Sequence, residues 1–178
     1  GEIDLSFPSI VGITSLTFGL ILTATDGNFF IAFALASALG MFAGLINGIL
    51  VTKIGIPSIV ATIGTLYFWR GLVNVISQGS GVAIVDVADG TWHHTLFVEK
   101  LFGKIPAQFI WFIVLTALMQ WVYRYHKFGN HIHFVGDNKD SSQMMGINVD
   151  NIKIIAFVQL GFFSSLAGIF TMYEMLYF

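Results

Sequence analysis

The sequence predicts an all-α protein, a polytopic bundle of transmembrane helices built from about five apolar segments. Of its 178 residues, 56% are hydrophobic and only 10% are charged, whereas soluble domains carry about 25% charged residues. The mean hydropathy of +0.80 points the same way. The apolar residues also come in blocks close to the roughly 20 residues that a helix needs to cross a bilayer. We therefore expect a multi-pass protein embedded in a lipid bilayer.

Composition also limits the partners and chemistry of the chain. It contains no cysteine, so neither a disulfide framework nor a thiol site is available. A net charge of −2 argues against nucleic acid as a partner. The chain starts without Met and stops inside an apolar run, so we expect it to be part of a longer protein. We do not expect the start to be a cleavable signal peptide, because no basic region precedes the first apolar run.

The first three apolar segments cover about residues 7–25, 29–51 and 57–76. The first ends at the turn-forming sequence Asp26-Gly27-Asn28, and its residues are compatible with a full span or with a broken, re-entrant segment. The second is rich in Gly and Ala, which lets helix backbones approach closely inside a membrane. The third begins at Pro57, a favourable residue in the first turn of a helix.

The last two apolar segments cover residues 105–125 and about 154–173, and polar loops lie at residues 77–104 and 126–152. Cytoplasmic loops carry more Lys and Arg than outer loops do. With the 52–56 turn and residues 124–153 on one side, that side has five such residues, and the other has Lys100 and Lys104. We therefore expect loop 126–152 in the cytoplasm and loop 77–104 outside. The five are Lys53, Arg124, Lys127, Lys139 and Lys153.

The longest polar stretch, residues 133–151, carries turn and helix-cap residues between two apolar segments. Residues 136–138 favour a turn, residues 141–145 a short helix, and Gly146 a left-handed helix end. Asp150 or Asn151 is the expected N-cap of the next helix. From the residues alone, a short helix gripped by a partner and an ordinary solvated loop are both open.

Three stretches resemble one known family. They are Gly1-Glu-Ile-Asp-Leu-Ser6, the stretch from Gly44-Leu-Ile-Asn-Gly48 through residues 56–65 to Arg70-Gly-Leu72, and the island of residues 136–149. Together they are similar to permease subunits of bacterial ABC importers for monosaccharides of the ribose, xylose and galactose type. The matches run in family order over nearly the whole chain. Ser141-Ser142 and Gln143 stand where the family usually has an alanine pair and an arginine.

The resemblance implies a single permease domain over residues 1–178, in the bacterial inner membrane and usually paired with a second copy. It implies a cytoplasmic ATP-binding subunit and an extracytoplasmic sugar-binding protein as partners, with a monosaccharide as the transported solute. No Gly-x-x-x-x-Gly-Lys-Ser/Thr phosphate loop occurs in the sequence, so we expect no enzyme and no cofactor here, and ATP hydrolysis on a separate chain. Loop 126–152 would be the coupling loop, touching the ATPase through Gly136, Asn138, Ser141, Ser142, Met145, Gly146 and Ile147.

Four polar residues in or beside the spans are candidates for the translocation path. Arg70 is the basic residue deepest in an apolar segment, and it either faces a cavity or reaches the outer headgroups. Asn74, four residues later, and Asn47 either extend a polar stripe or hold helices together. Asp4 either caps the first helix or pairs with Arg70 or another buried donor.

Five histidines invite a metal site, but no cysteine and no carboxylate at a recognised ligand spacing accompanies them, so no metal is expected. An alternative to the importer is an energy-independent channel, or a structural membrane subunit without an ATPase partner. The two functions differ in whether loop 126–152 binds an ATPase.

Overall fold

The computed structural model describes residues 1–101 and 103–178. All five apolar segments form helices, which confirms the all-α prediction. Two short strands, paired antiparallel, precede the helix of the fourth segment. The elements are α1 (Phe7–Ala24), α2 (Phe29–Ile49), η1 (Leu50–Ile54), α3 (Ser58–Ser77), α4 (Val85–Ala88), α5 (Trp92–Phe97), β1 (Lys100–Leu101), β2 (Ile105–Pro106), α6 (Ala107–Tyr125), α7 (Lys127–Asp137), α8 (Lys139–Met144) and α9 (Val149–Met175).

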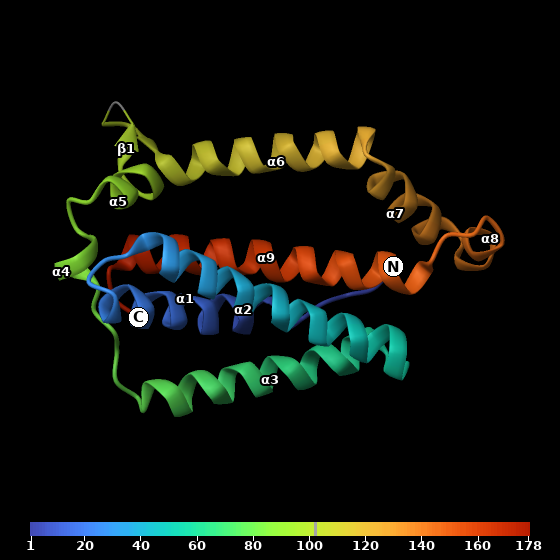
Figure 1. The fold of residues 1–178 in the computed structure, drawn as a ribbon, viewed down its shortest axis with the longest axis horizontal. Helices are drawn as coiled ribbons and strands as arrows, with labels where there is room; N and C mark the ends of the chain where they lie inside the picture. Colours follow the sequence, from blue (N-terminus) through green and yellow to red (C-terminus); the bar gives the residue numbers. More distant parts are fainter. Residues whose placement is uncertain (102) are drawn as a thin grey trace.

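The core is a bundle in which α9 packs along α2 and α1, and α1 also packs against α3 (Figure 1). Gly1 lies toward the end of the bundle that carries α8, and the chain finishes at the opposite end, near α4. We call these the α8 end and the α5 end. Within the described residues, four helices are long and apolar enough to cross a membrane: α1, α2 with η1, α3 and α9.

The fourth apolar segment forms α6 as expected, but α6 is not among these four helices. Gln108, Gln120 and Arg124 lower its hydropathy. It runs along the upper edge of Figure 1, apart from the bundle, and Ala107 is its one buried residue among those described. Side-chain hydrogen bonds connect α6 to α9. In one of them the Tyr123 hydroxyl donates to Gln159 Oε1 at 3.3 Å.

The closest helix contact is between α2 and α9, where glycines of the two helices face each other. A Cβ added at Gly161 would lie 2.1 Å from the carbonyl oxygen of Gly40, and one added at Gly44 would lie 2.2 Å from that of Phe157. No side chain fits at such distances. The small residues of the second segment therefore allow the close approach that the sequence predicted.

The α2–α3 connection contains a π-helical turn, η1, which continues α2 beyond the predicted end of the second segment. Gly55 then takes a φ of +84°, which favours glycine, and the Ile56 N–H closes the turn on the Leu50 carbonyl at 3.1 Å. The chain thereby reverses direction within a few residues. Lys53 is left at the α8 end of the bundle.

The turn expected at residues 136–138 is narrower than predicted, and the prediction was wrong for Gly136 and Asp137. Gly136 and Asp137 are the last residues of α7, whose Phe128, Ile132 and Val135 recur at helical spacing. That apolar periodicity outweighs the roughly 1 kcal/mol that a glycine costs inside a helix. Only the last of the three residues, Asn138, breaks the helix.

The expected limits of the next two helices also need correction. The short helix is Lys139–Met144 rather than 141–145, because Asn138 Oδ1 accepts the Ser141 N–H at 3.0 Å and caps it. The N-cap of α9 is Asn148, which accepts the Asn151 N–H at 3.0 Å. The cap is neither Asp150 nor Asn151, and α9 starts before Lys153.

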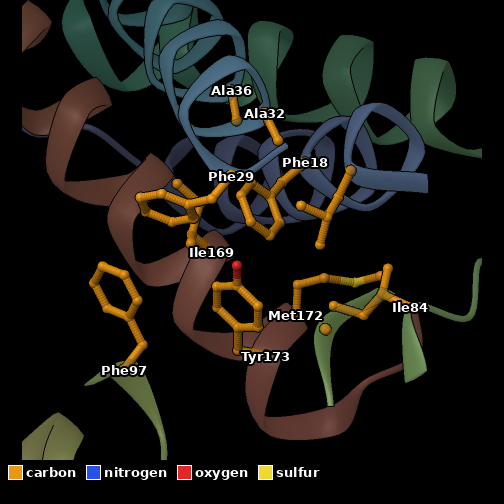
Figure 2. Packing of buried hydrophobic residues seen from close by; sticks show 11 residues of the cluster. Phe18, Phe29, Ala32, Ala36, Ile84, Phe97, Ile169, Met172 and Tyr173 are labelled. Atoms are coloured by element: carbon orange, nitrogen blue, oxygen red, sulfur yellow. The ribbon is translucent and has the colours of Figure 1, made fainter. Parts of the chain in front are cut away.

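At the α5 end, loop 77–104 covers the ends of α1, α2 and α9 with an apolar cluster (Figure 2). Phe18 and Tyr173 meet edge to face at 5.1 Å between ring centroids. Ile84 is fully buried, and its N–H donates to the Leu176 carbonyl at 3.0 Å. The loop is thereby fixed to the end of α9 by both side chains and backbone.

Within this cluster, His93 of α5 is a buried, neutral ring. Its Nδ1 lies 2.8 Å from the Tyr173 hydroxyl and 2.9 Å from the Thr91 hydroxyl, within hydrogen-bond distance of both. The ring stacks on Phe29 at 5.3 Å. Burial lowers the pKa of His93 below its ordinary value, and the neighbouring His94 adds to this shift.

The α2–α9 contact predicts a large effect of one methyl group. We expect Gly161→Ala to reduce the free energy of unfolding by about 1–3 kcal/mol, because the helices must move apart or distort. Gly64→Ala on α3 is the control, since nothing lies within 4 Å of its added Cβ. The control should be neutral or slightly stabilising. Equal melting temperatures for the two variants in detergent would contradict the close packing.

Candidate functional site

Residues 1–5 form an extended segment that lies along α3, and Ser6, which has helical dihedral angles, is the N-cap of α1. The Ile3 N–H donates to Ser58 Oγ at 3.3 Å, and the Leu5 N–H donates to Thr62 Oγ1 at 3.1 Å. Extended backbone inside a membrane bundle needs such partners, because lipid offers none. Hydroxyl groups of α3 therefore accept hydrogen bonds from the backbone of this segment, as the carbonyl groups of a neighbouring strand do in a sheet.

Asn47 of α2 is the centre of this contact and is completely buried. Its Nδ2 donates to Asp4 Oδ2 at 3.0 Å and to Ser6 Oγ at 2.7 Å, while its Oδ1 accepts from Thr65 Oγ1 at 2.8 Å. The Ser6 hydroxyl in turn donates a hydrogen bond to Asp4 Oδ1 at 2.6 Å. Both amide protons of Asn47 and its oxygen are thus engaged. We call this group the polar seam: Asp4, Ser6, Asn47, Ser58, Thr62 and Thr65.

The polar seam brings together two of the four residues proposed for the translocation path. Asp4 pairs with a buried donor, Asn47, and also accepts the Ser6 N–H at 2.7 Å at the start of α1. Arg70 lies elsewhere, exposed on α3 beside a cavity of about 230 Å³ that Ser9 and Gly12 of α1 also line. Asn74 is exposed farther along α3. Whether solute passes any of the four stays a prediction.

A larger cavity, of about 540 Å³, lies between the extended segment, α7 and α9. Asp4 lines it from the segment and Gly136 lines it from α7. Glu2 and Lys153, which form an ion pair, also line it. The hydrogen bond from Lys153 lowers the pKa of the Glu2 carboxyl, against an opposing effect of burial.

The predicted coupling residues gather around α8, with Gly136 just before it on α7. Ser142 is buried and donates to the Asn138 carbonyl at 2.8 Å, and it accepts the Ile147 N–H on its own carbonyl at 3.0 Å. Gly146 has a φ of +78°, as the sequence predicted. Met144 is 88% exposed, and Met145 is 58% exposed. The corner is thus internally bonded and presents two flexible apolar side chains.

Sequence reasoning missed several partners at these sites. Ser58, Thr62 and Thr65 recur at i, i+4 and i+7, a helical stripe of hydroxyls that could have pointed to the seam. The ion pairs Glu2–Lys153 and Lys53–Asp150 join residues far apart in the sequence, and no local signal announces them. In the part of the chain that the structure describes, no three His, Asp or Glu residues gather as metal ligands.

Among the described residues, four helices long and apolar enough to cross a bilayer define a multi-pass membrane protein. The family described as "Branched-chain amino acid transport system / permease component" matches residues 1–175. The chain therefore belongs to this family of membrane permeases, as the resemblance in its sequence indicated, and it is a multi-pass protein of the inner membrane.

Curated relatives carry a more particular description. The chain is 37% identical over 169 residues to the autoinducer 2 import system permease protein LsrC of Yersinia pseudotuberculosis serotype O:3 (strain YPIII). It is 35% identical over 168 residues to LsrC of Yersinia pestis (strain Pestoides F). Each match covers 94% of this chain and 46% of the relative, so the chain spans about half the length of these proteins. No solved structure matches the chain.

The polar seam predicts a strong effect of removing one amide. We expect Asn47→Ala to reduce the free energy of unfolding by about 2–4 kcal/mol, because Asp4 and Thr65 lose a buried partner. Asn74→Ala, which truncates an exposed asparagine, should stay within about 0.5 kcal/mol of the unmutated protein. Thermal unfolding in detergent measures both. Similar small shifts for the two variants would show that the seam does not hold the helices.

Proposed function

We propose that this chain forms the translocating part of a membrane subunit in an ATP-driven importer of a monosaccharide or similar small solute. The observation that carries the proposal is the α7–α8–α9 corner. It is a short helix with capped entry and exit, a buried anchor in Ser142 and two exposed methionines, in a chain of the permease family. The curated relatives are named for import of autoinducer 2, which makes that compound the first solute to try.

In this proposal the α8 end faces the cytoplasm and the α5 end faces outward. Lys53 and Lys153 lie at the α8 end, together with α7 and its neighbouring cations. Excess Lys and Arg on that side supports the orientation. Loop 77–104, fixed over the opposite end, would then offer a firm surface to an extracytoplasmic sugar-binding protein.

The energy source would be a separate ATP-binding subunit that grips α8. A rigid short helix can convert closure of the ATPase into rigid-body movement of the helices joined to it. A second copy of this permease would complete the channel. Because this chain lacks a phosphate loop, its part in the cycle is mechanical, and ATP hydrolysis belongs to the partner.

Purification of the full-length protein from its own membrane tests the proposal directly. We expect mass spectrometry to find an ATPase subunit in stoichiometric amount. The purified complex in liposomes should take up labelled autoinducer 2, ribose, xylose or galactose when ATP is supplied. Uptake that needs no ATP, with no ATPase recovered, would favour the energy-independent channel instead.

The left-handed backbone of Gly146 gives a sharper test of α8 itself. We expect Gly146→Trp to reduce solute uptake per ATP hydrolysed roughly tenfold, because forcing a bulky side chain into φ +78° costs about 1–2 kcal/mol and tilts α8. Gly146→Asn is the matched control, since asparagine tolerates this conformation and should keep transport coupled. Normal coupling in the tryptophan variant would remove α8 from the mechanism.

A further inference from the structure

Two ion pairs meet on the first turn of α9. Lys53 Nζ lies 3.0 Å from Asp150 Oδ2, and Lys153 pairs with Glu2. Asp150 and Lys153 are three residues apart, so both project from neighbouring positions of the same helical turn. Asp150 is also placed well for the helix dipole, which favours an acidic group near the N-terminus.

The two partners of this turn belong to different parts of the bundle. Lys53 lies in η1, the continuation of α2, whereas Glu2 lies in the extended segment. These two elements are joined to each other through the hydrogen bond from Asn47 to Asp4. The contacts therefore form a closed ring: the first turn of α9, α2, the polar seam, the extended segment, and the first turn again.

The connection from α8 to this turn of α9 is short and hydrogen-bonded. Asn148 caps α9 by accepting the Asn151 N–H at 3.0 Å, and the Ile147 N–H is bonded back to Ser142 of α8 at 3.0 Å. Four residues, Met145 to Asn148, separate the two helices, and one of them is the left-handed Gly146. A displacement of α8 must therefore move the first turn of α9.

We propose that Glu2–Lys153 and Lys53–Asp150 are positioning contacts that pass the movement of α8 to α2 and to the extended segment. This inference rests on the proposed function. Both pairs are partly exposed, with side-chain exposures of 53% and 37% for Lys53 and Asp150. Ion pairs in such places add little to stability. Their loss should thus leave the fold intact and affect the coupling of solute movement to ATP hydrolysis, which separates positioning from a merely structural role.

A double-mutant cycle on each pair tests the proposal in the full-length protein with its ATPase. For the first pair the variants are Lys53→Gln, Asp150→Asn and both together. We expect each single variant to raise the ATP hydrolysed per solute imported about threefold to fivefold. The double variant should match the singles, because one contact is lost in every case. Glu2→Gln and Lys153→Gln form the second cycle, with labelled autoinducer 2 and ribose as probes.

Arg124→Gln is the control, because it removes one exposed positive charge at the end of α6, outside loop 126–152, where no ion pair is formed among the described residues. Its coupling ratio and all melting temperatures should be unchanged. The ion-pair role is overturned if the unmutated protein is coupled and the variants are equally coupled, or if the two single effects multiply in the double variant. An unmutated protein without ATP-dependent uptake overturns the proposed function and this inference together.

Discussion

The structure as a whole depends on how the extended backbone of residues 1–5 finds hydrogen-bond partners, because it cannot bond to itself as a helix does. Where this segment lies against the bundle, its N–H groups need partners inside the protein, because a bilayer provides none. Hydroxyls spaced one helical turn apart on α3 supply two of them, and Asn47 fixes Asp4 and Ser6. The position of α1 therefore depends on α2 and α3 through polar contacts as much as through apolar packing.

The two ends of the bundle are held by different kinds of contact. The α5 end is closed by aromatic packing and a buried histidine, so loop 77–104 moves with the helices beneath it. The α8 end is held by ion pairs and capped turns, which can shift at small cost. Between them, the glycine contact of α2 with α9 leaves no room for adjustment by side chains.

The five helices and the class of protein could be predicted from the sequence, because apolar block length and turn residues are local signals. The polar seam could not, since Asp4 and Asn47 are 43 positions apart and their pairing depends on how α1 and α3 pack. Competing local signals caused the errors. Asn148, Asp150 and Asn151 can all cap a helix, and the end of α8 decides among them. Likewise, Gly136 favours a turn, but the apolar face of α7 keeps it in the helix.

The extended segment also has a consequence for how the protein is made. Residues 1–5 leave the ribosome before α3 exists, yet their hydrogen-bond partners Ser58 and Thr62 belong to α3. Until α3 is made, the N–H groups of Ile3 and Leu5 must bond to water or to lipid headgroups instead. The contact of the extended segment with the bundle can therefore form only after the third helix has been synthesised.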